Sequence, residues 1–293
     1  MKIIKKYYSS LAVILFITFI TASCKKHDME FSGQVLIDEK TQSAFIIHHF
    51  VPMIDNDTNY IRMVELNGEI IYRSDIVTFN AAPSGAAGRF FLAPKGKSNL
   101  KMYLGKGSAP DIDYTLVCDK DITLEAGQYY NVFVHDFDAE LVVINCNYPF
   151  VDTPDLSLRD SCTYVKFYNF MYDSIGKPTT LRLQYKHQNH FNTNEWINIG
   201  SPLFFGESTG WEALKMQRLA GLNSGARTVY YRIYVVDENG NEIGRLQRMN
   251  SSGNYVDHTY NATGTIGRRV HHIFGGYRND KTIRADVRLF YAR

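Results

Sequence analysis

Cysteine is scarce in this chain, with four residues among 293, and the three that follow residue 24 lack the C-x-x-C or C-x-x-H spacing of a zinc site. The short sequences that mark common catalytic sites are also missing. There is no G-x-S-x-G elbow, no Walker loop, no H-E-x-x-H and no strand-to-helix glycine fingerprint. We therefore expect a protein that is not an enzyme and that uses no cofactor and no metal.

Long hydrophobic runs are equally rare. The one uncharged, largely apolar run is residues 11–22, which follows three lysines and ends in small residues. A positive head, an apolar run and small residues are the three parts of an export signal. Twelve helical residues rise about 18 Å, well short of the roughly 30 Å of bilayer hydrocarbon. Residues 1–23 are therefore predicted to be a signal peptide that is removed.

The end of this segment predicts a lipid anchor. Ile20-Thr21-Ala22-Ser23-Cys24 resembles the lipobox of bacterial lipoproteins, although Thr21 departs from the usual leucine. The resemblance implies that Cys24 is the lipid attachment residue and that residues 24–32 are a tether to the membrane. We expect an outer-membrane lipoprotein that faces the cell exterior; the alternative is a plain secreted protein.

The charge balance argues against nucleic acid as a partner. Without the three lysines of the signal the chain has 29 basic and 30 acidic residues, a net charge of −1, whereas nucleic-acid binders are usually basic. Residues 245–293 contain nine basic and three acidic residues. This basic end could meet anionic lipid headgroups or an acidic glycan, but we favour arginines on the wet faces of strands.

Three cysteines remain if Cys24 carries lipid. An exported chain meets an oxidising compartment, so one disulfide is allowed. Cys146 with Cys162 is the preferred pair, because it would tie the end of one domain to the start of the next. The alternative is that these two and Cys118 are all small buried hydrophobic residues.

The body of the chain predicts an all-β protein, since short runs of Val, Ile, Tyr, Phe and Thr alternate with Gly, Asn, Asp and Pro clusters. The clearest hairpin is residues 230–237 returning through Asn239-Gly240. Residues 283–291 alternate as a last strand with a dry odd-numbered face and a mostly wet even-numbered face that includes Phe290. Residues 212–219 have a helical composition, but we expect strand or an irregular edge there.

An internal repeat divides the body into two similar units. Segment 45–50 matches 165–170 at an offset of 120, segment 100–103 matches 231–234 at 131, and segment 129–133 matches 269–273 at 140. Offsets that only increase indicate one unit copied, with longer loops in the second copy. We predict two tandem Ig-like or transthyretin-like β-sandwich domains, at residues 33–148 and 157–293, joined by a linker at 149–156.

Segments 121–134 and 162–170 resemble the domain of unknown function DUF4397, whose members read "glycine, aromatic, Thr or Asn, aliphatic, Phe" and then "Val-Arg-Phe-aliphatic-Asn". Here Lys166 replaces the usual arginine, and His271-His272 replace an expected tyrosine-threonine pair. The resemblance implies a tandem β-sandwich lipoprotein on the outer surface. It implies no catalytic residues.

Metal-binding patterns are weak. Adjacent histidines at 48–49 and 271–272 point to opposite faces of a strand. The pair His187 and His190 and the acidic groups at 136–140 and 55–59 are more typical of loops and turns than of metal sites.

Aromatic residues give the best functional hypothesis, because exposed rings hold carbohydrate and protein ligands. Trp196, Trp211 and Tyr277, with Tyr230, lie in the copy with longer loops and are candidate ligand-binding residues, although most such rings are core residues. Asp173-Ser174-Ile175 also resembles a bacterial O-glycosylation acceptor. Three hypotheses follow: a surface glycan-binding accessory of the starch-utilisation type, an adhesive fimbrillin-like subunit, and an enzyme without a recognisable motif.

Overall fold

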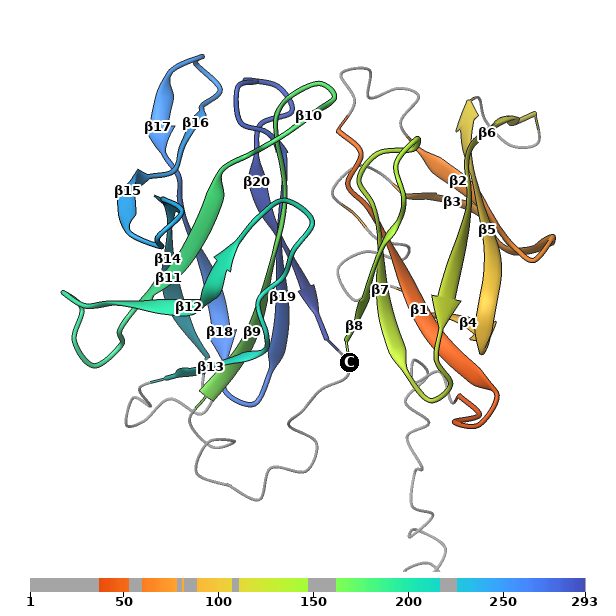
Figure 1. Ribbon diagram of the computed structural model, residues 1–293, viewed down its shortest axis with the longest axis horizontal. Coiled ribbons are helices and arrows are strands. Elements are labelled where there is room, and N and C mark those ends of the chain that lie inside the picture. The colour runs from red at the N-terminus through yellow and green to blue at the C-terminus, as the bar shows by residue number, and fades with distance from the viewer. Residues whose placement is uncertain are drawn as a thin grey trace, which may run out of the picture. The chain divides into compact units, whose positions relative to one another are not determined.

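Every regular element in the described part of the chain is a β-strand, as the sequence predicts (Figure 1). The computed structural model describes residues 37–52, 60–77, 81, 89–106, 111–146, 162–216 and 226–292. The strands of the first half are β1 (Gln42–His49), β2 (Ile61–Leu66), β3 (Glu69–Val77), β4 (Phe91–Pro94), β5 (Gly96–Lys106), β6 (Asp113–Leu124), β7 (Tyr129–Val134) and β8 (Val142–Asn145). Those of the second half are β9 (Cys162–Ser174), β10 (Lys177–Pro178), β11 (Arg182–Gln188), β12 (Trp196–Leu203), β13 (Glu212–Lys215), β14 (Ala226–Val236), β15 (Glu242–Arg245), β16 (Gln247–Met249), β17 (Tyr255–Asp257), β18 (Thr259–Thr265), β19 (Arg269–Tyr277) and β20 (Asp286–Tyr291).

Four sheets form two sandwiches. The first sandwich has the sheets β4-β1-β7-β8 and β3-β2-β5-β6. The second has β10-β9-β19-β20, with β13 also on β9, and β12-β11-β14-β15, with β18 also on β14. Each has its own apolar core, around Phe45 and Met102 in the first and around Phe167 and Ile233 in the second. The predicted all-β sandwich fold is confirmed, while Cys24, the tether 24–32 and the linker 149–156 lie outside the described residues.

The two halves repeat the same strand connections. Strand β1 pairs in parallel with β7, Ala44 opposite Tyr129, and β9 pairs in parallel with β19, Tyr164 opposite Arg269. Tyr164 follows Ala44 by 120 residues and Arg269 follows Tyr129 by 140, and these are the offsets of the sequence comparison.

In the other sheet of each sandwich, Glu65 of β2 pairs with Lys101 of β5, and Lys186 of β11 pairs with Arg232 of β14. Arg232 follows Lys101 by the sequence offset of 131, and Lys186 then follows Glu65 by 121. Residues 60–63 match 180–183 in the sequence at an offset of 120, one residue short of this value. The ladder, combined with the sequence offset of 131, therefore corrects the offset of the other strand.

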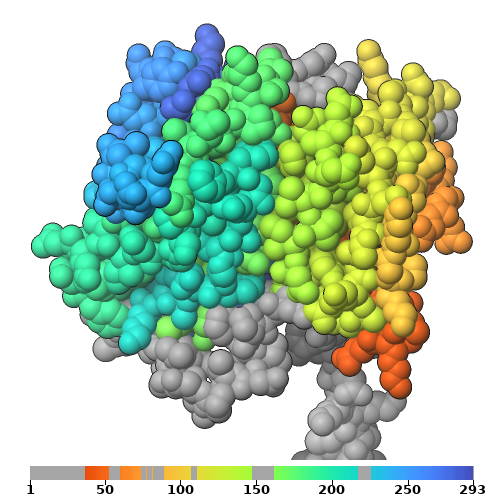
Figure 2. Space-filling view, viewed as in Figure 1, coloured from red at the N-terminus to blue at the C-terminus, as the bar shows by residue number. Residues whose placement is uncertain are grey.

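A third apolar cluster joins the two sandwiches within the compact unit Val35–Arg293. We call it the inter-sandwich interface; its buried members are Ile46, Phe50, Phe133, Tyr168, Phe170, Ile273 and Phe290. The rings of Phe133 and Phe170 are stacked with centroids 4.6 Å apart. In the space-filling view the two halves meet along a closely packed seam (Figure 2). Strands β1, β9 and β19 are therefore buried on both faces, and each contains an unbroken run of buried residues.

Equivalent positions meet across this interface. Phe50 and Phe170 are related by the offset of 120, and their ring centroids lie 6.2 Å apart. A contact between the same position on both partners is the mark of an isologous interface, which in most proteins joins two separate chains. Here both partners belong to one chain.

A chain of buried hydrogen bonds crosses the interface. His48 Nε2 donates to Asn131 Oδ1 at 2.9 Å, Asn131 Nδ2 donates to the Tyr168 hydroxyl at 3.1 Å, and that hydroxyl donates to His271 Nδ1 at 2.9 Å. Burial lowers the pKa of His48 to about 4 and holds that of His271 well below its usual value. Both imidazoles are therefore neutral at pH 7, and Nδ1 of a neutral His271 can accept the hydroxyl proton of Tyr168.

The last strand corrects one prediction. In β20 the side chains of Val287 and Leu289 pack against the core of the second sandwich, as the alternation predicts. Phe290, expected on the wet face, is only 5 % exposed and belongs to the inter-sandwich interface. Tyr291, expected on the dry face, is 43 % exposed because the strand ends there.

The expected disulfide is also wrong. Among the described residues, Cys118, Cys146 and Cys162 are buried thiols that form no disulfide. The pKa of Cys146 is raised to about 12 by burial. The alternative interpretation, in which all three act as small hydrophobic residues, agrees with the structure.

The two local predictions for the second half are confirmed. Strands β14 and β15 form the expected hairpin, with Gly240 at a φ of 85° in its turn. Residues 212–215 form strand β13 on β9 rather than a helix, because Leu214 there packs into the core.

Candidate functional site

A surface pocket of about 510 Å³ lies on the sheet β12-β11-β14-β15 of the second sandwich. We call it the Trp196 pocket; its lining residues are Gln188, Trp196, Tyr230, Tyr231, Arg232, Thr259, Tyr260 and Asn261. Side chains alternate along β14, so Tyr231 and Ile233 enter the core while Tyr230 and Arg232 point outward. The pocket is thus built on rigid sheet rather than on a loop.

Trp196 and Arg232 form the centre of the pocket. The guanidinium carbon of Arg232 lies 3.8 Å from the centroid of the Trp196 ring, a close cation–π contact. Trp196 is opposite Gln188 in the β11-β12 ladder, and Gln188 Nε2 donates to the carbonyl of Thr193 at 2.7 Å, which fastens the intervening loop. The indole and the guanidinium are therefore held in place before any ligand arrives.

Tyr230 and Asn261 extend the pocket across the sheet. They are cross-strand partners of β14 and β18. Tyr230 is 51 % exposed and offers a free aromatic ring, and Asn261 is an exposed amide with both donor and acceptor groups. The open surface thus combines rings with uncharged polar groups.

Behind the pocket, on the core side of the same sheet, lies a neutral aromatic pair. The rings of Tyr231 and Tyr260 are stacked at 4.8 Å, and the Tyr260 hydroxyl lies 3.0 Å from His272 Nδ1. Burial raises the pKa of Tyr260 well above its usual value and lowers that of His272 to about 3.

Of the three predicted ligand-binding residues, the structure places only Trp196 in the pocket. Trp211 is half-buried, with its ring 4.8 Å from that of His271. Tyr277 is 3 % exposed, and its hydroxyl donates to the carbonyl of Pro52 in the first half of the chain. The prediction is therefore wrong for Tyr277, because its ring helps to join the two sandwiches.

Trp196 itself lies in a different setting from the one expected. The sequence suggested an inserted loop, but Trp196 begins strand β12, and the loop is only the short connection at residues 189–195. Sequence reasoning named Tyr230 and missed Arg232, Gln188 and Asn261. These residues come from three strands, and only the pairing register brings them together.

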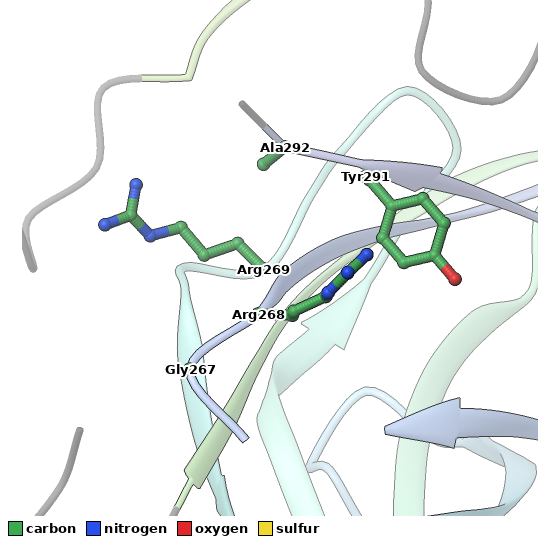
Figure 3. Close-up of a pocket in the computed structure, with 5 residues that line it drawn as sticks. All are labelled: Gly267, Arg268, Arg269, Tyr291 and Ala292. Atoms are coloured by element: carbon green, nitrogen blue, oxygen red, sulfur yellow. The ribbon is translucent and has the colours of Figure 1, made fainter. Parts of the chain in front are cut away.

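A second, smaller pocket of about 260 Å³ lies at the end of the second sandwich (Figure 3). Its lining includes Arg268, Arg269 and Tyr291, with the Arg268 guanidinium carbon 5.4 Å from the Tyr291 ring centroid. Figure 3 shows the Arg269 side chain pointing away from that ring. The two arginines thus do not converge on one point.

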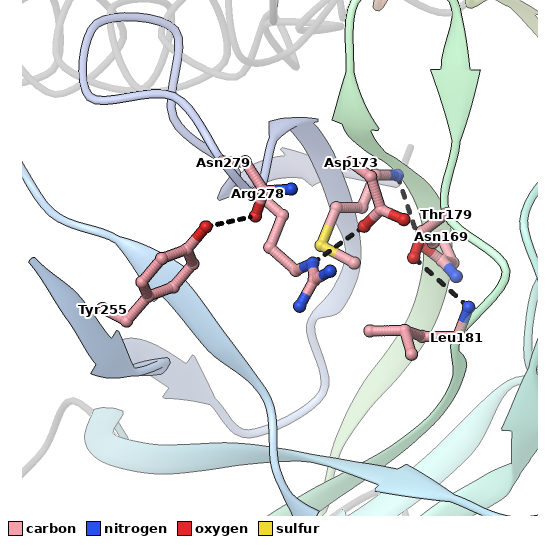
Figure 4. A network of polar contacts seen from close by, with 8 residues as sticks. Asn169, Asp173, Thr179, Leu181, Tyr255, Arg278 and Asn279 are labelled. Atoms are coloured by element: carbon pink, nitrogen blue, oxygen red, sulfur yellow. Dashed lines mark hydrogen bonds and ion pairs between the residues drawn. The ribbon is translucent and has the colours of Figure 1, made fainter. Parts of the chain in front are cut away.

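The Asp173-Ser174-Ile175 segment lies at the turn between β9 and β10. Asp173 Oδ1 accepts a hydrogen bond from Arg278 Nε at 2.8 Å, and Tyr255 donates to Asn279 close by at 2.9 Å (Figure 4). Ile175 is 62 % exposed. The O-glycosylation of Ser174 stays a prediction at an accessible turn.

The weak metal-binding patterns do not converge. His187 Nδ1 lies 3.1 Å from the carbonyl of Gln188, and Glu140 forms an ion pair with Lys120 at 3.4 Å. Within the part of the chain that the structure describes, no group of three or more His, Cys, Asp or Glu side chains could hold a metal ion. The acidic group at residues 55–59 lies outside the described residues.

No protein-family model and no curated protein matches this chain. The likeness to DUF4397 therefore stays a prediction. Within the described residues no helix is long and apolar enough to cross a lipid bilayer.

Proposed function

We propose that this protein is a lipid-anchored binding protein of the bacterial cell envelope and that it holds a glycan in the Trp196 pocket. The observation that carries the proposal is the arrangement of Trp196, Tyr230 and Arg232 on one outward sheet face, in a pocket of about 510 Å³. We also propose that the chain is a non-enzymatic DUF4397-type protein.

The chemistry of the pocket supports a sugar as the ligand. A sugar ring has apolar C–H faces, which pack on aromatic rings, and a rim of hydroxyls, which need hydrogen-bonding partners. Tyr230 supplies the exposed ring, and Asn261, Thr259 and Arg232 supply amide, hydroxyl and guanidinium groups. A purely apolar partner would leave these polar groups unpaired, at a cost in binding free energy.

The binding test compares Trp196→Ala with Tyr291→Ala in the full chain. Tyr291 is a matched control because it is also partly exposed, at 43 %, and lies outside the pocket. We expect a glycan array to identify a ligand of the unaltered chain, and titration to give at least a tenfold loss of affinity for Trp196→Ala only. Equal affinity of both variants, with unchanged thermal unfolding, would contradict the proposal.

The proposed anchor places the pocket near a membrane surface. A signal at residues 1–23 and lipid on Cys24 would hold the soluble sandwiches at the outer membrane, facing the cell exterior, with two or more acyl chains making the attachment stable. Radiolabelled palmitate should enter the protein and should be absent from Cys24→Ala. Protease added to intact cells should remove the sandwiches if they face outward.

The alternative is an adhesive, fimbrillin-like subunit that exchanges a donor strand. The donor strand would take the place of β1, the first described strand, which lies between β4 and β7, because removal of β1 would leave the backbone groups of both neighbours unpaired. Monomeric, untrimmed protein recovered from whole envelopes would exclude it.

A further inference from the structure

We propose that the Trp196 pocket selects glycans that carry an oxyanion, a carboxylate or a sulfate ester, and that Arg232 is the residue that recognises it. This inference rests on the proposed glycan-binding function and adds the class of ligand. It is carried by a comparison of the same sheet position in the two sandwiches.

In the first sandwich the equivalent positive charge is neutralised. Lys101 is the equivalent of Arg232. Lys101 pairs with Glu65 in the first sandwich, and Arg232 pairs with Lys186, the equivalent of Glu65, in the second. On the next strand Lys101 is opposite Asp119, and their side chains form an ion pair at 3.5 Å.

In the second sandwich the two acids that β6 contributes to that face, Asp119 and Asp121, are replaced by neutral residues. Thr259 is opposite Arg232, at the position of Asp119. Asn261 is opposite Tyr230, at the position of Asp121, which in the first sandwich pairs with Lys97 at 2.7 Å. The face has therefore lost the Lys97–Asp121 pair, with Thr228 at the place of Lys97, and it has lost the carboxylate of Asp119 while keeping the cation that Asp119 neutralised.

Arg232 is left without an anionic partner. Among the described residues it forms no ion pair, whereas the neighbouring Lys186 is paired with Glu242. A cation in a half-buried pocket attracts an anion more strongly than one on an open surface, because less water screens it. The charge of the site thus favours an acidic ligand.

The contact with Trp196 prepares Arg232 to bind an oxyanion through two oxygens. The guanidinium carbon of Arg232 lies over the Trp196 ring, 3.8 Å from its centroid, so the flat guanidinium group packs against the indole. The N–H donors of a guanidinium lie in its plane, so they stay available at its edge. Carboxylate and sulfate oxygens match this fork in a bidentate way, which an ammonium group cannot reproduce.

The test uses three polymers with one backbone: dextran, carboxymethyl dextran and dextran sulfate. The full chain, purified in detergent, is compared with Arg232→Gln and with Thr259→Asp, which restores the acid of the first sandwich. Lys101→Gln is the matched control, since it removes the equivalent cation. We expect at least one charged polymer to bind about tenfold more tightly than dextran to the unaltered chain and to Lys101→Gln. That preference should disappear in both pocket variants, with thermal unfolding unchanged.

The outcomes separate this inference from the proposed function. Equal binding of all three polymers, lost in Trp196→Ala, would overturn the oxyanion inference and leave glycan binding intact. A preference for charged polymers that survives in Arg232→Gln would also overturn it, because the attraction would then be general. Binding of none of the three polymers, together with no glycan on an array, would overturn both. A tighter complex with carboxymethyl dextran than with dextran sulfate would assign the carboxylate, and the reverse would assign the sulfate.

Discussion

The amide nitrogen of Asn131 donates to the hydroxyl of Tyr168 at 3.1 Å, and this bond joins the two sandwiches. It is one link of the buried chain from His48 to His271. Such a chain is satisfied only when both sandwiches are docked, since each half supplies two of its four members. The interface is therefore specific as well as apolar, and the two sandwiches should behave as one unit.

Acid should weaken the fold through the buried histidines. The pKa of His48 is about 4 when folded and about 6.5 when unfolded, so between these values the unfolded chain binds more protons. The free energy of unfolding is highest above pH 6.5. As the pH decreases it falls by about 1.4 kcal/mol per pH unit for each such histidine, and the fall ends near pH 4. His48→Gln keeps an amide donor for Asn131 and should reduce the loss between pH 7 and pH 4.5 by about 3 kcal/mol in urea unfolding. An identical loss in this variant would exclude His48 as a cause.

Loss of the Phe133 ring should uncouple the sandwiches. Phe133 contacts Phe50, Tyr168 and Phe170, and its truncation to alanine in a buried site costs about 3 to 5 kcal/mol. We expect calorimetry to show one unfolding transition for the unaltered chain and two for Phe133→Ala. Leu100→Ala, in the first core, is the control and should lower the midpoint without splitting the peak. Two transitions in the unaltered chain would refute the coupling.

Gly276 should not tolerate alanine. Its φ is 101°, and a Cβ there would lie 2.6 Å from the carbonyl oxygen of Arg284, a backbone atom that cannot move aside easily. Gly240 also has a positive φ, 85°, but a Cβ there meets nothing within 4 Å. Gly276→Ala should therefore cost clearly more than the roughly 1 kcal/mol of positive-φ strain expected for Gly240→Ala. Equal melting temperatures would show that the backbone at Arg284 and Ala285 shifts to make room.

The three buried thiols should not react with thiol reagents until the chain unfolds. Burial raises the pKa of Cys118 to about 11 and of Cys146 to about 12, and a buried, protonated thiol reacts slowly. Ellman's reagent should therefore modify none of Cys118, Cys146 and Cys162 in the native protein and all three in guanidinium chloride without reductant. Only one reactive thiol after unfolding would restore the rejected disulfide.

The amino-acid sequence by itself determined the fold class and the repeat. Alternation of apolar residues assigns the two faces of each strand, and matching segments at 120 and 140 identify equivalent strands, because both properties are local to a segment. It also singled out Trp196 and Tyr230 as candidate rings. A sequence comparison could have shown that Thr259 and Asn261 replace Asp119 and Asp121, but only once the register was known.

The tertiary structure alone decided what covers each face. A period of two shows which residues share a side, and it cannot show whether water or another sheet lies against that side. Phe290 and Tyr277 are buried for this reason, since the partner surface comes from the other half of the chain. The same holds for the pocket, where Trp196, Tyr230 and Arg232 become neighbours only through the pairing of β11, β12, β14 and β18. Cross-strand register is a long-range property, and it places the charge of Arg232 beside a threonine instead of an aspartate.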